Sequence, residues 1–127
     1  MSWRDVGSRR TGGAASRSPR ARQAIDRQAT TFAALGDKTR LHLVAVLCAG
    51  GAVSITDLTA GTELTRQAVT KHLQVLADAG LVRDVKVGRE RRWQFEAARL
   101  AEARRALEAY GARWDRALDR LKTSLER

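Results

Sequence analysis

The sequence is poor in the residues that most catalytic and metal sites need. It has one cysteine, Cys48, and two histidines, His42 and His72, among 127 residues. A single cysteine excludes an intrachain disulfide and a cysteine-pair redox switch, and it suits a reducing compartment. Because the two histidines are separated and the carboxylates are not clustered, the chain offers no nucleophile–base pair and no metal triad, so we do not expect an enzyme.

Long apolar runs are also missing. No stretch approaches the roughly 18 apolar residues that a membrane-spanning helix needs. The first residues lack the apolar segment of a secretory signal. We therefore expect a cytoplasmic protein with no membrane partner.

Positive charge is what the chain has in excess. Its 24 Lys and Arg residues against 14 Asp and Glu residues give a net charge of +10. The excess is uneven, since the stretch from Arg66 to Arg92 holds seven basic residues and three acidic ones. A local excess of this kind is typical of a face that binds a polyanion.

The chain divides into a tail, a domain and a final helix. Residues 1–20 are rich in Arg, Ser and Gly without hydrophobic periodicity, which predicts a basic flexible tail. A solvated tail and an arm that reaches phosphates or the minor groove are both open. Residues 21–96 are expected to form one folded domain, and residues 97–127 a final helix of the same domain.

Two helices are expected before the basic stretch. In residues 21–35, Ile25, Ala29 and Phe32 fall on one helical face. Residues 41–49 are apolar on nearly every side, which predicts a central buried helix with Cys48 in the core.

The next segment has the features of a helix-turn-helix. Ser54 can cap a short helix, residues 61–63 can turn the chain, and Thr65 can cap a second helix that ends before Gly80. The second helix has an apolar stripe of Val69, Leu73 and Leu76. Its outward side chains are of the kinds that read base edges in a major groove: Arg66, Gln67, Thr70 and Lys71. An ordinary surface helix is the alternative.

A β-hairpin is expected directly behind this helix. After Gly80 the apolar period changes to two, with Val85 and Val87 before a turn at residues 88–90, and Trp93 and Phe95 after it. The candidate phosphate contacts on this wing are Arg83, Lys86, Arg89, Arg91 and Arg92. A solvated, charge-protected hairpin edge is the alternative, but its place behind the helix-turn-helix favours a wing that contacts DNA.

The last segment predicts a long helix with an apolar seam. Its seam residues step by three or four positions, close to a heptad pattern. The seam consists of Leu100, Leu107, Tyr110, Trp114, Leu118, Leu121 and Leu125. A small domain cannot cover so long a stripe, so part of it should meet a second subunit, with intramolecular packing as the alternative. Gly111 interrupts the seam and could divide or bend the helix.

Three segments together resemble the ArsR family of winged-helix transcriptional repressors: FAALGDKTRLHLVAVL, SITDLTAGTELTRQAVTKHLQVLADAGLV and VGRERRWQF. The final helix, RLAEARRALEAYGARWDRALDRLKTSLER, resembles a subgroup with a tyrosine and a tryptophan before a Leu-rich end. The resemblance implies a mainly α fold with a small β-hairpin wing. It also implies a homodimer through the first and last helices, which adds Ile25 and Phe32 to the predicted dimer seam. Two recognition helices would then lie in major grooves about 34 Å apart.

The chain departs from the metal-sensing members that it resembles. Those members carry Cys-x-Cys before Asp-Leu, where this chain has Ser54 and Thr56. A second metal site of the family needs histidines on the last helix, and this one has none. We therefore expect no metal and no other cofactor.

The leading hypothesis is a sequence-specific transcriptional repressor that binds a pseudo-palindromic operator in double-stranded DNA as a homodimer. A non-specific architectural DNA-binding protein and a winged-helix module for protein contacts remain open. An apolar effector could occupy a cavity around Tyr110, Trp114 and Leu118, although a plain dimer core is favoured there. Regulation by dimerisation alone, without any ligand, is also open.

Overall fold

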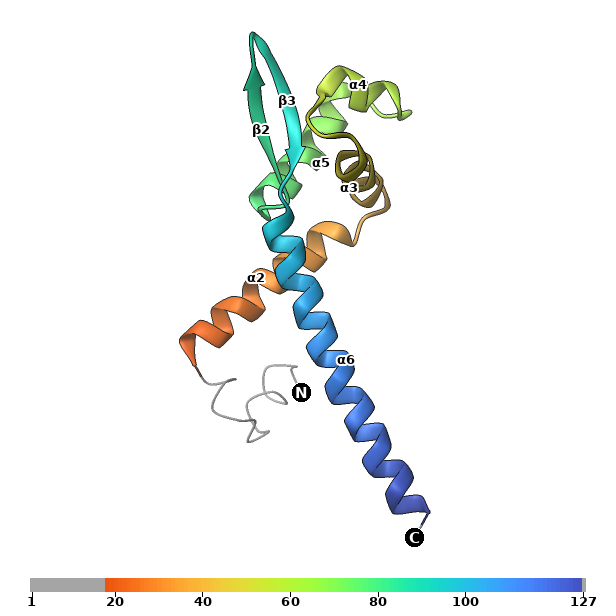
Figure 1. Ribbon diagram of the computed structural model, residues 1–127. Coiled ribbons are helices and arrows are strands. Elements are labelled where there is room, and N and C mark those ends of the chain that lie inside the picture. Colours follow the sequence, from red (N-terminus) through yellow and green to blue (C-terminus); the bar gives the residue numbers. More distant parts are fainter. Residues whose placement is uncertain (1–17, 127) are drawn as a thin grey trace, which may run out of the picture.

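The computed structural model describes residues 18–126, so most of the predicted tail lies outside it. The elements follow one another as α2 (Pro19–Leu35), α3 (Lys38–Gly50), β1 (Val53–Ser54), α4 (Ile55–Ala60), α5 (Arg66–Asp78), β2 (Val82–Val87), β3 (Glu90–Phe95) and α6 (Ala97–Leu125) (Figure 1). The fold is mainly helical with a small antiparallel sheet, as the sequence predicts. No helix among residues 18–126 has both the length and the apolarity that a membrane crossing needs.

Helix α2 begins two residues earlier than predicted. Ser18 is its N-cap, and its hydroxyl accepts a hydrogen bond from the backbone N–H of Ala21 at 3.3 Å. Pro19 occupies the first turn, where its fixed φ suits a helix and its missing N–H costs nothing. Pro19 and Arg20 therefore belong to the helix and not to the tail.

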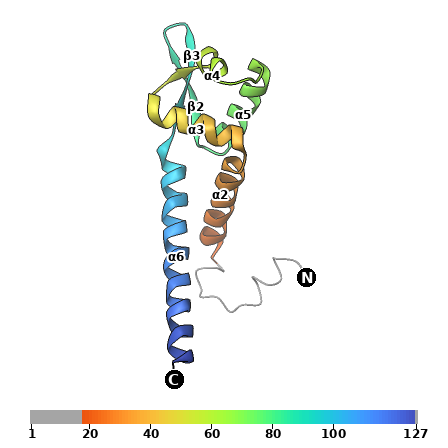
Figure 2. The same cartoon turned by 90° about the vertical axis from the view of Figure 1, so that its right-hand side faces the viewer.

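The helix expected over residues 41–49 is present as part of α3, but the prediction that it is buried is wrong. In α3 only Leu43, Val44 and Leu47 are buried, whereas Leu41 is 53% and Val46 50% exposed. Cys48 is also exposed, so its assignment to the core is wrong. Helix α3 lies at the surface of the domain. It contacts α5, β3 and α2, and no other element covers the side that faces the viewer in Figure 2.

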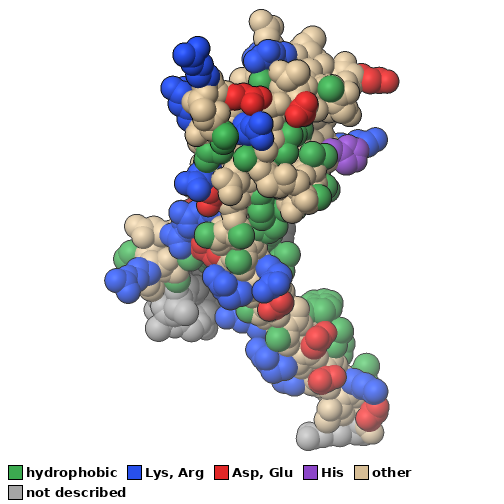
Figure 3. All heavy atoms as spheres, turned by 45° about the horizontal axis from the view of Figure 1, so that its top comes forward, with side chains coloured by type: hydrophobic (Ala, Val, Ile, Leu, Met, Phe, Trp, Pro, Cys, Tyr) green, Lys and Arg blue, Asp and Glu red, His purple; other side chains and the backbone are tan. Residues whose placement is uncertain are grey.

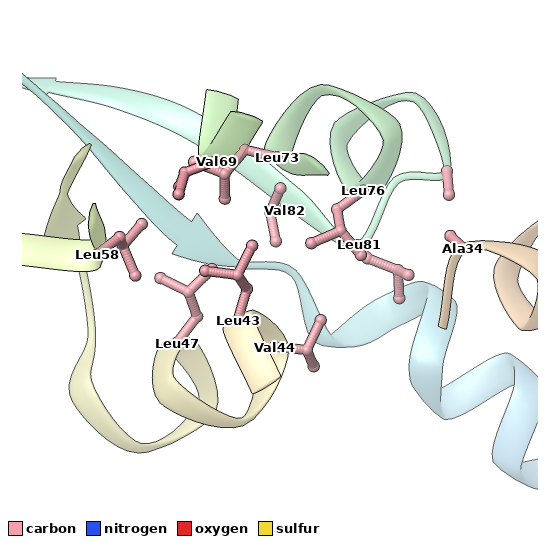
Figure 4. Packing of buried hydrophobic residues seen from close by; sticks show 11 residues of the cluster. Ala34, Leu43, Val44, Leu47, Leu58, Val69, Leu73, Leu76, Leu81 and Val82 are labelled. Carbon is pink, nitrogen blue, oxygen red and sulfur yellow. The ribbon is translucent and has the colours of Figure 1, made fainter. Parts of the chain in front are cut away.

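The core gathers one apolar face from each element around α5. Val69, Leu73 and Leu76 have no exposed surface, which confirms the predicted stripe. Figure 4 shows these side chains meeting those of the other helices and of the segment after α5: Ala34, Leu43, Val44, Leu47, Leu58, Leu81 and Val82. The buried stripe thus fixes which face of α5 points to solvent.

The predicted ends of the helix-turn-helix are confirmed. The hydroxyl of Ser54 accepts from the backbone N–H of Asp57, and that of Thr65 accepts from the N–H of Ala68, both at 3.1 Å. Gly80 follows α5 with a φ of 76°, a left-handed conformation that glycine adopts without a Cβ clash. Local capping therefore sets where α5 starts and stops.

The sheet has three antiparallel strands in the order β1-β3-β2. Strands β2 and β3 form the predicted hairpin, and Val82 pairs with Phe95 at its base and Val87 with Glu90 at its tip. The two-residue strand β1, which was not predicted, pairs with β3. This third strand attaches the wing to the segment just before α4.

Helix α6 runs unbroken through Gly111, at which an added Cβ would have no neighbour within 4 Å. It packs against α2 through the Arg27–Glu102 ion pair at 3.0 Å and the Tyr110 hydroxyl, which donates to Gln28 Oε1 at 3.0 Å. Beyond that contact, α6 projects away from the rest of the described chain as a free arm (Figures 1 and 2).

Candidate nucleic-acid interface

Three of the four predicted base-reading side chains point freely into solvent. Arg66, Gln67 and Lys71 are exposed on the first two turns of α5, opposite its buried stripe. Within residues 18–126 none of their side chains has a hydrogen bond or ion pair to another residue. The first turn of α5 holds no acidic residue, so it presents the positive end of the helix dipole without an opposing charge.

The fourth predicted residue, Thr70, is already engaged. Its hydroxyl donates to the backbone carbonyl of Arg66 at 2.8 Å. The oxygen can still accept a hydrogen bond, and the methyl group is available to a thymine methyl. Thr70 can therefore contribute an acceptor or an apolar contact, but not a donor, in this conformation.

Gln74 was not predicted but lies on the same outward face as Thr70 and Lys71, one turn further along α5. It is exposed, and its amide donates to Asp78 Oδ1 at 2.9 Å. The spacing of four from Thr70 could have identified its position. The amide of Gln74 thus already has a partner, whereas the amide of Gln67 has none within residues 18–126.

The five predicted wing cations do not all lie on one face of the hairpin. Antiparallel pairing places cross-strand partners on the same face of the hairpin. Lys86 pairs with Arg91 on the face that also carries Trp93, whereas Arg83 and Arg92 lie on the opposite face. Figure 3 shows Lys and Arg side chains gathered at the hairpin end of the molecule, in the upper left of that view.

Acidic neighbours further divide these cations. Arg92 pairs with Glu90 at 3.1 Å, Arg91 lies 3.7 Å from Asp84, and Arg83 forms an ion pair with Glu96. Lys86 and Arg89 have no ion pair to any residue in the described range. The unopposed charge of the wing therefore lies near its tip.

Two carboxylates have a lowered pKa, one beside Arg40 at the start of α3 and one beside Arg27 in the middle of α2. The backbone N–H of Arg40 donates to Asp37 and lowers the pKa of that carboxyl, and the charge of Arg40 acts in the same direction. The hydrogen bond from the Arg27 side chain lowers the pKa of Glu102. Because both values are lowered, these contacts stabilise the fold at neutral pH and are lost as acid protonates the carboxylates.

The two positions where metal sensors carry thiolates have oxygen side chains with different surroundings. Ser54 is buried and its hydroxyl caps α4, while Thr56 is exposed. Between residues 18 and 126, no three His, Cys, Asp or Glu residues are grouped closely enough to hold a metal ion.

The predicted dimer seam is partly inside the domain and mostly outside it. Leu100 packs on the core, Phe32 is half-buried, and Ala103 of α6 is buried. The remaining large side chains of the seam are exposed: Ile25, Leu107, Tyr110, Trp114, Leu118, Leu121 and Leu125. Figure 3 shows hydrophobic side chains along one edge of the α6 arm and charged ones along the other.

Comparison with known proteins gives matches over the same region. A helix-turn-helix domain family matches residues 35–85. An uncharacterised HTH-type transcriptional regulator of Bacillus subtilis, YuzN, is 39% identical over 66 residues, which are 47% of this chain and 72% of that protein. The arsenical resistance operon repressor of the same organism is 39% identical over 51 residues, 40% of this chain and about half (49%) of the repressor.

Two solved structures show the same fold. An ArsR-like transcriptional regulator from Rhodococcus sp. RHA1 has a TM-score of 0.70 and 40% sequence identity, and the match covers 78% of this chain and 92% of that one. A homodimeric winged helix-turn-helix DNA-binding domain from Mycobacterium bovis has a TM-score of 0.59 and 21% identity, with 87% and 94% covered. The second likeness concerns the fold alone.

Proposed function

The chain belongs to the ArsR family of winged helix-turn-helix transcriptional regulators, and we propose that it is a sequence-specific repressor that binds a pseudo-palindromic operator as a homodimer without a metal. The observation that carries this proposal is the outward face of α5. Arg66, Gln67 and Lys71 stand there exposed and unpaired within the described part of the chain. Because no acidic residue stands in the first turn of α5, their donors remain available to a negatively charged partner.

The chemistry of this face fits the major groove. A guanidinium or ammonium can donate to the O6 and N7 of guanine, and a glutamine amide can pair with the N6 and N7 of adenine. Thr70 adds an acceptor or a methyl contact. The unpaired cations of the wing, Lys86 and Arg89, suit phosphates beside the site and carry no base information.

The second subunit is proposed from the exposed seam. From Leu107 to Leu125 the apolar side chains of α6 lie open to solvent, and Ile25 on α2 is 47% exposed. A continuous apolar stripe of this length is costly to leave in water. A two-fold copy that covers it presents two α5 helices at fixed spacing, about 34 Å or one turn of DNA apart.

Independence from metal is proposed from the chemistry of the positions concerned. Soft thiophilic metals need thiolates or several imidazoles. Ser54 offers a hydroxyl that is already used as a cap, and Thr56 offers another hydroxyl. One relative, the arsenical resistance operon repressor, supports the repressor role but carries no weight for a metal in this chain.

A non-specific architectural role is the second candidate, favoured by one observation. The net charge is +10, and Lys86 and Arg89 have no acidic partner among the described residues. These features bind any DNA through phosphates. The two candidates differ in how far they prefer one DNA sequence over another.

A Gln67→Ala variant tests the base-reading assignment. We expect it to weaken binding of a duplex selected by the protein from a random library by about 1–3 kcal/mol, and to relax the preference at one base pair. Fluorescence anisotropy titration of single-base variants of that duplex measures both effects. Gln23→Ala, an exposed glutamine on α2, is the matched control. Equal losses of DNA affinity in both variants would show that Gln67 does not read a base.

An Arg89→Ala variant tests the wing. Because Arg89 has no ion pair within residues 18–126, we expect uniformly weaker binding to all sequences and a salt slope lower by about one. The measurement is the dissociation constant as a function of salt concentration. Arg92→Ala, which removes a cation already paired with Glu90, should change the slope less. A slope that is unchanged in Arg89→Ala contradicts this role.

A further inference from the structure

The side chain of Arg40 joins three helices. Arg40 lies near the start of α3, where its Nε donates to the carbonyl of Ala34 at 2.6 Å and its Nη2 to that of Ala33 at 3.3 Å. Ala33 and Ala34 belong to the last turn of α2. Its Nη1 lies 3.4 Å from Nδ1 of His72, in the middle of α5. One guanidinium thus links the end of α2 to the helix that carries the proposed base-reading residues.

The contacts on α2 are not easily replaced. The last carbonyls of a helix have no partner within the helix, and the planar guanidinium donates to two of them at once. The carbonyl of Ala33 also accepts from the backbone N–H of Gly36, whereas that of Ala34 is held by Arg40. The same group then has one more donor directed at His72. A lysine would keep the charge, but its single ammonium nitrogen cannot replace the three guanidinium nitrogens that contact Ala33, Ala34 and His72.

The contact to His72 requires a neutral imidazole. Arginine can only donate, so Nδ1 of His72 must accept and its proton must sit on Nε2. The same Nδ1 lies 3.8 Å from Oδ2 of Asp37. A protonated Nδ1 would instead face a second cation and would gain the carboxylate as a partner.

We propose that Arg40 is a positioning residue for α5, that it acts through the neutral imidazole of His72, and that protonation of His72 weakens operator binding. This inference rests on the proposed function, in which α5 reads the operator. Protonation exchanges the partner of His72 from Arg40 to Asp37. The two helices still pack through Ala34 and the stripe of α5, but α5 loses its hydrogen bond to the guanidinium that holds the end of α2. The angle at which α5 enters the groove then depends on pH.

The surroundings of His72 favour such an exchange. The N-cap and first turn of α3 supply Asp37 and Arg40, and α2 contributes only its carbonyls, held by Arg40. On α5 itself the residues one turn away are Ala68, Val69, Val75 and Leu76, and none of them is charged. Within the described chain, α4 and β2 make no hydrogen bond or ion pair to this imidazole.

Solvent reaches the side chains of His72 and Asp37, which are 25% and 36% exposed. A hollow of about 280 Å³ lies on another side of Arg40 and is also lined by Asp78, whose carboxylate accepts from Gln74. The pKa of Asp37 is lowered by the Arg40 backbone hydrogen bond, so its carboxylate stays ionised down to mild acid. Histidine is the side chain whose charge ordinarily changes between about pH 5 and 8.

A simple charge effect predicts the opposite sign. An imidazolium on a helix that faces DNA adds a positive charge and should tighten binding to any duplex. The partner exchange should instead weaken the selected duplex while leaving binding to random DNA unchanged or tighter. The direction of the change therefore separates the two explanations.

The test compares three variants of the full chain at about pH 7.5 and about pH 5.5 and constant ionic strength. For the parent we expect the dissociation constant of the selected duplex to rise about three- to tenfold in acid. His72→Gln, which keeps an acceptor but cannot titrate, should hold its affinity within about twofold. His42→Gln, which alters the only other histidine, should behave as the parent. Arg40→Lys should bind more weakly at the higher pH and show little pH dependence.

A parent that binds the selected duplex equally or more tightly in acid overturns the proposal, as does a His72→Gln variant that retains the acid loss. Failure of the parent to select any duplex at the higher pH contradicts the proposed function instead. In that case NMR of the protein without DNA still decides. We expect His72 as the Nε2–H tautomer, with the Arg40 Nε resonance following its titration; an Arg40 resonance that ignores this titration overturns the inference.

Discussion

A Trp114→Glu variant is expected to be monomeric and to bind the selected duplex about 100-fold more weakly or worse, because each subunit then holds its half-site alone. Trp114 is 65% exposed at the centre of the open stretch of seam on α6. A carboxylate at that position would have to be buried without a partner when two arms meet. Sedimentation equilibrium measures the assembly, and anisotropy titration measures the affinity.

The matched control is Ala112→Glu. Ala112 is exposed on α6 two residues before Trp114, which places it on another face of the helix, and the substitution makes the same change in charge. We expect this variant to remain dimeric and to bind DNA nearly as the parent does. A Trp114→Glu protein that stays dimeric would place the second subunit elsewhere.

A Leu73→Ala variant is expected to lose about 2–5 kcal/mol of the free energy of unfolding, through lost burial and the cavity left behind. Leu73 has no exposed surface and lies in the middle of α5, where it meets the side chains of several elements. That loss is a large share of the roughly 5–15 kcal/mol that holds a domain together. Urea unfolding at a fixed protein concentration measures it, because assembly contributes to the apparent stability.

Val75→Ala is the control on the same helix. Val75 is 41% exposed, so its truncation removes little buried surface. We expect a change of less than about 1 kcal/mol. Comparable losses in both variants would mean that the buried stripe does not hold α5 in place.

Local signals made the helix-turn-helix predictable. Thr65 and Ser54 are caps whose hydrogen bonds span three residues, and the stripe of Val69, Leu73 and Leu76 repeats within one helix. Such features depend on neighbours in sequence, which the sequence displays directly. The same reasoning placed Arg66 and Lys71 outward, because they lie opposite the stripe.

Features that depend on distant partners could not be predicted in this way. The apolar composition of α3 does not tell which of its faces another element will cover, and Leu41 lies on the uncovered one. The strand β1 exists only because β3 pairs with it. The split of the wing cations between two faces follows from the register of β2 and β3, which alternation alone does not specify.

The Arg40–His72 contact belongs to the same class. The two residues are 32 positions apart, and nothing around either signals the other. Thr70 is an intermediate case, because its bond to the carbonyl of Arg66 is local but competes with the outward role assigned to it. The sequence thus predicts which residues of the candidate site are exposed, but not which hydrogen-bond partners they have within the fold.

The central claim is that this chain prefers one DNA sequence, and competition binding tests it most directly. The full chain, bound to its selected labelled duplex at fixed salt, is titrated with unlabelled random-sequence DNA and, separately, with the unlabelled selected duplex. We predict that displacement needs about 1,000-fold or more random DNA than selected duplex. Equal displacement by the two competitors would contradict the account and indicate an architectural protein, and no salt-dependent binding at all would indicate a module for protein contacts.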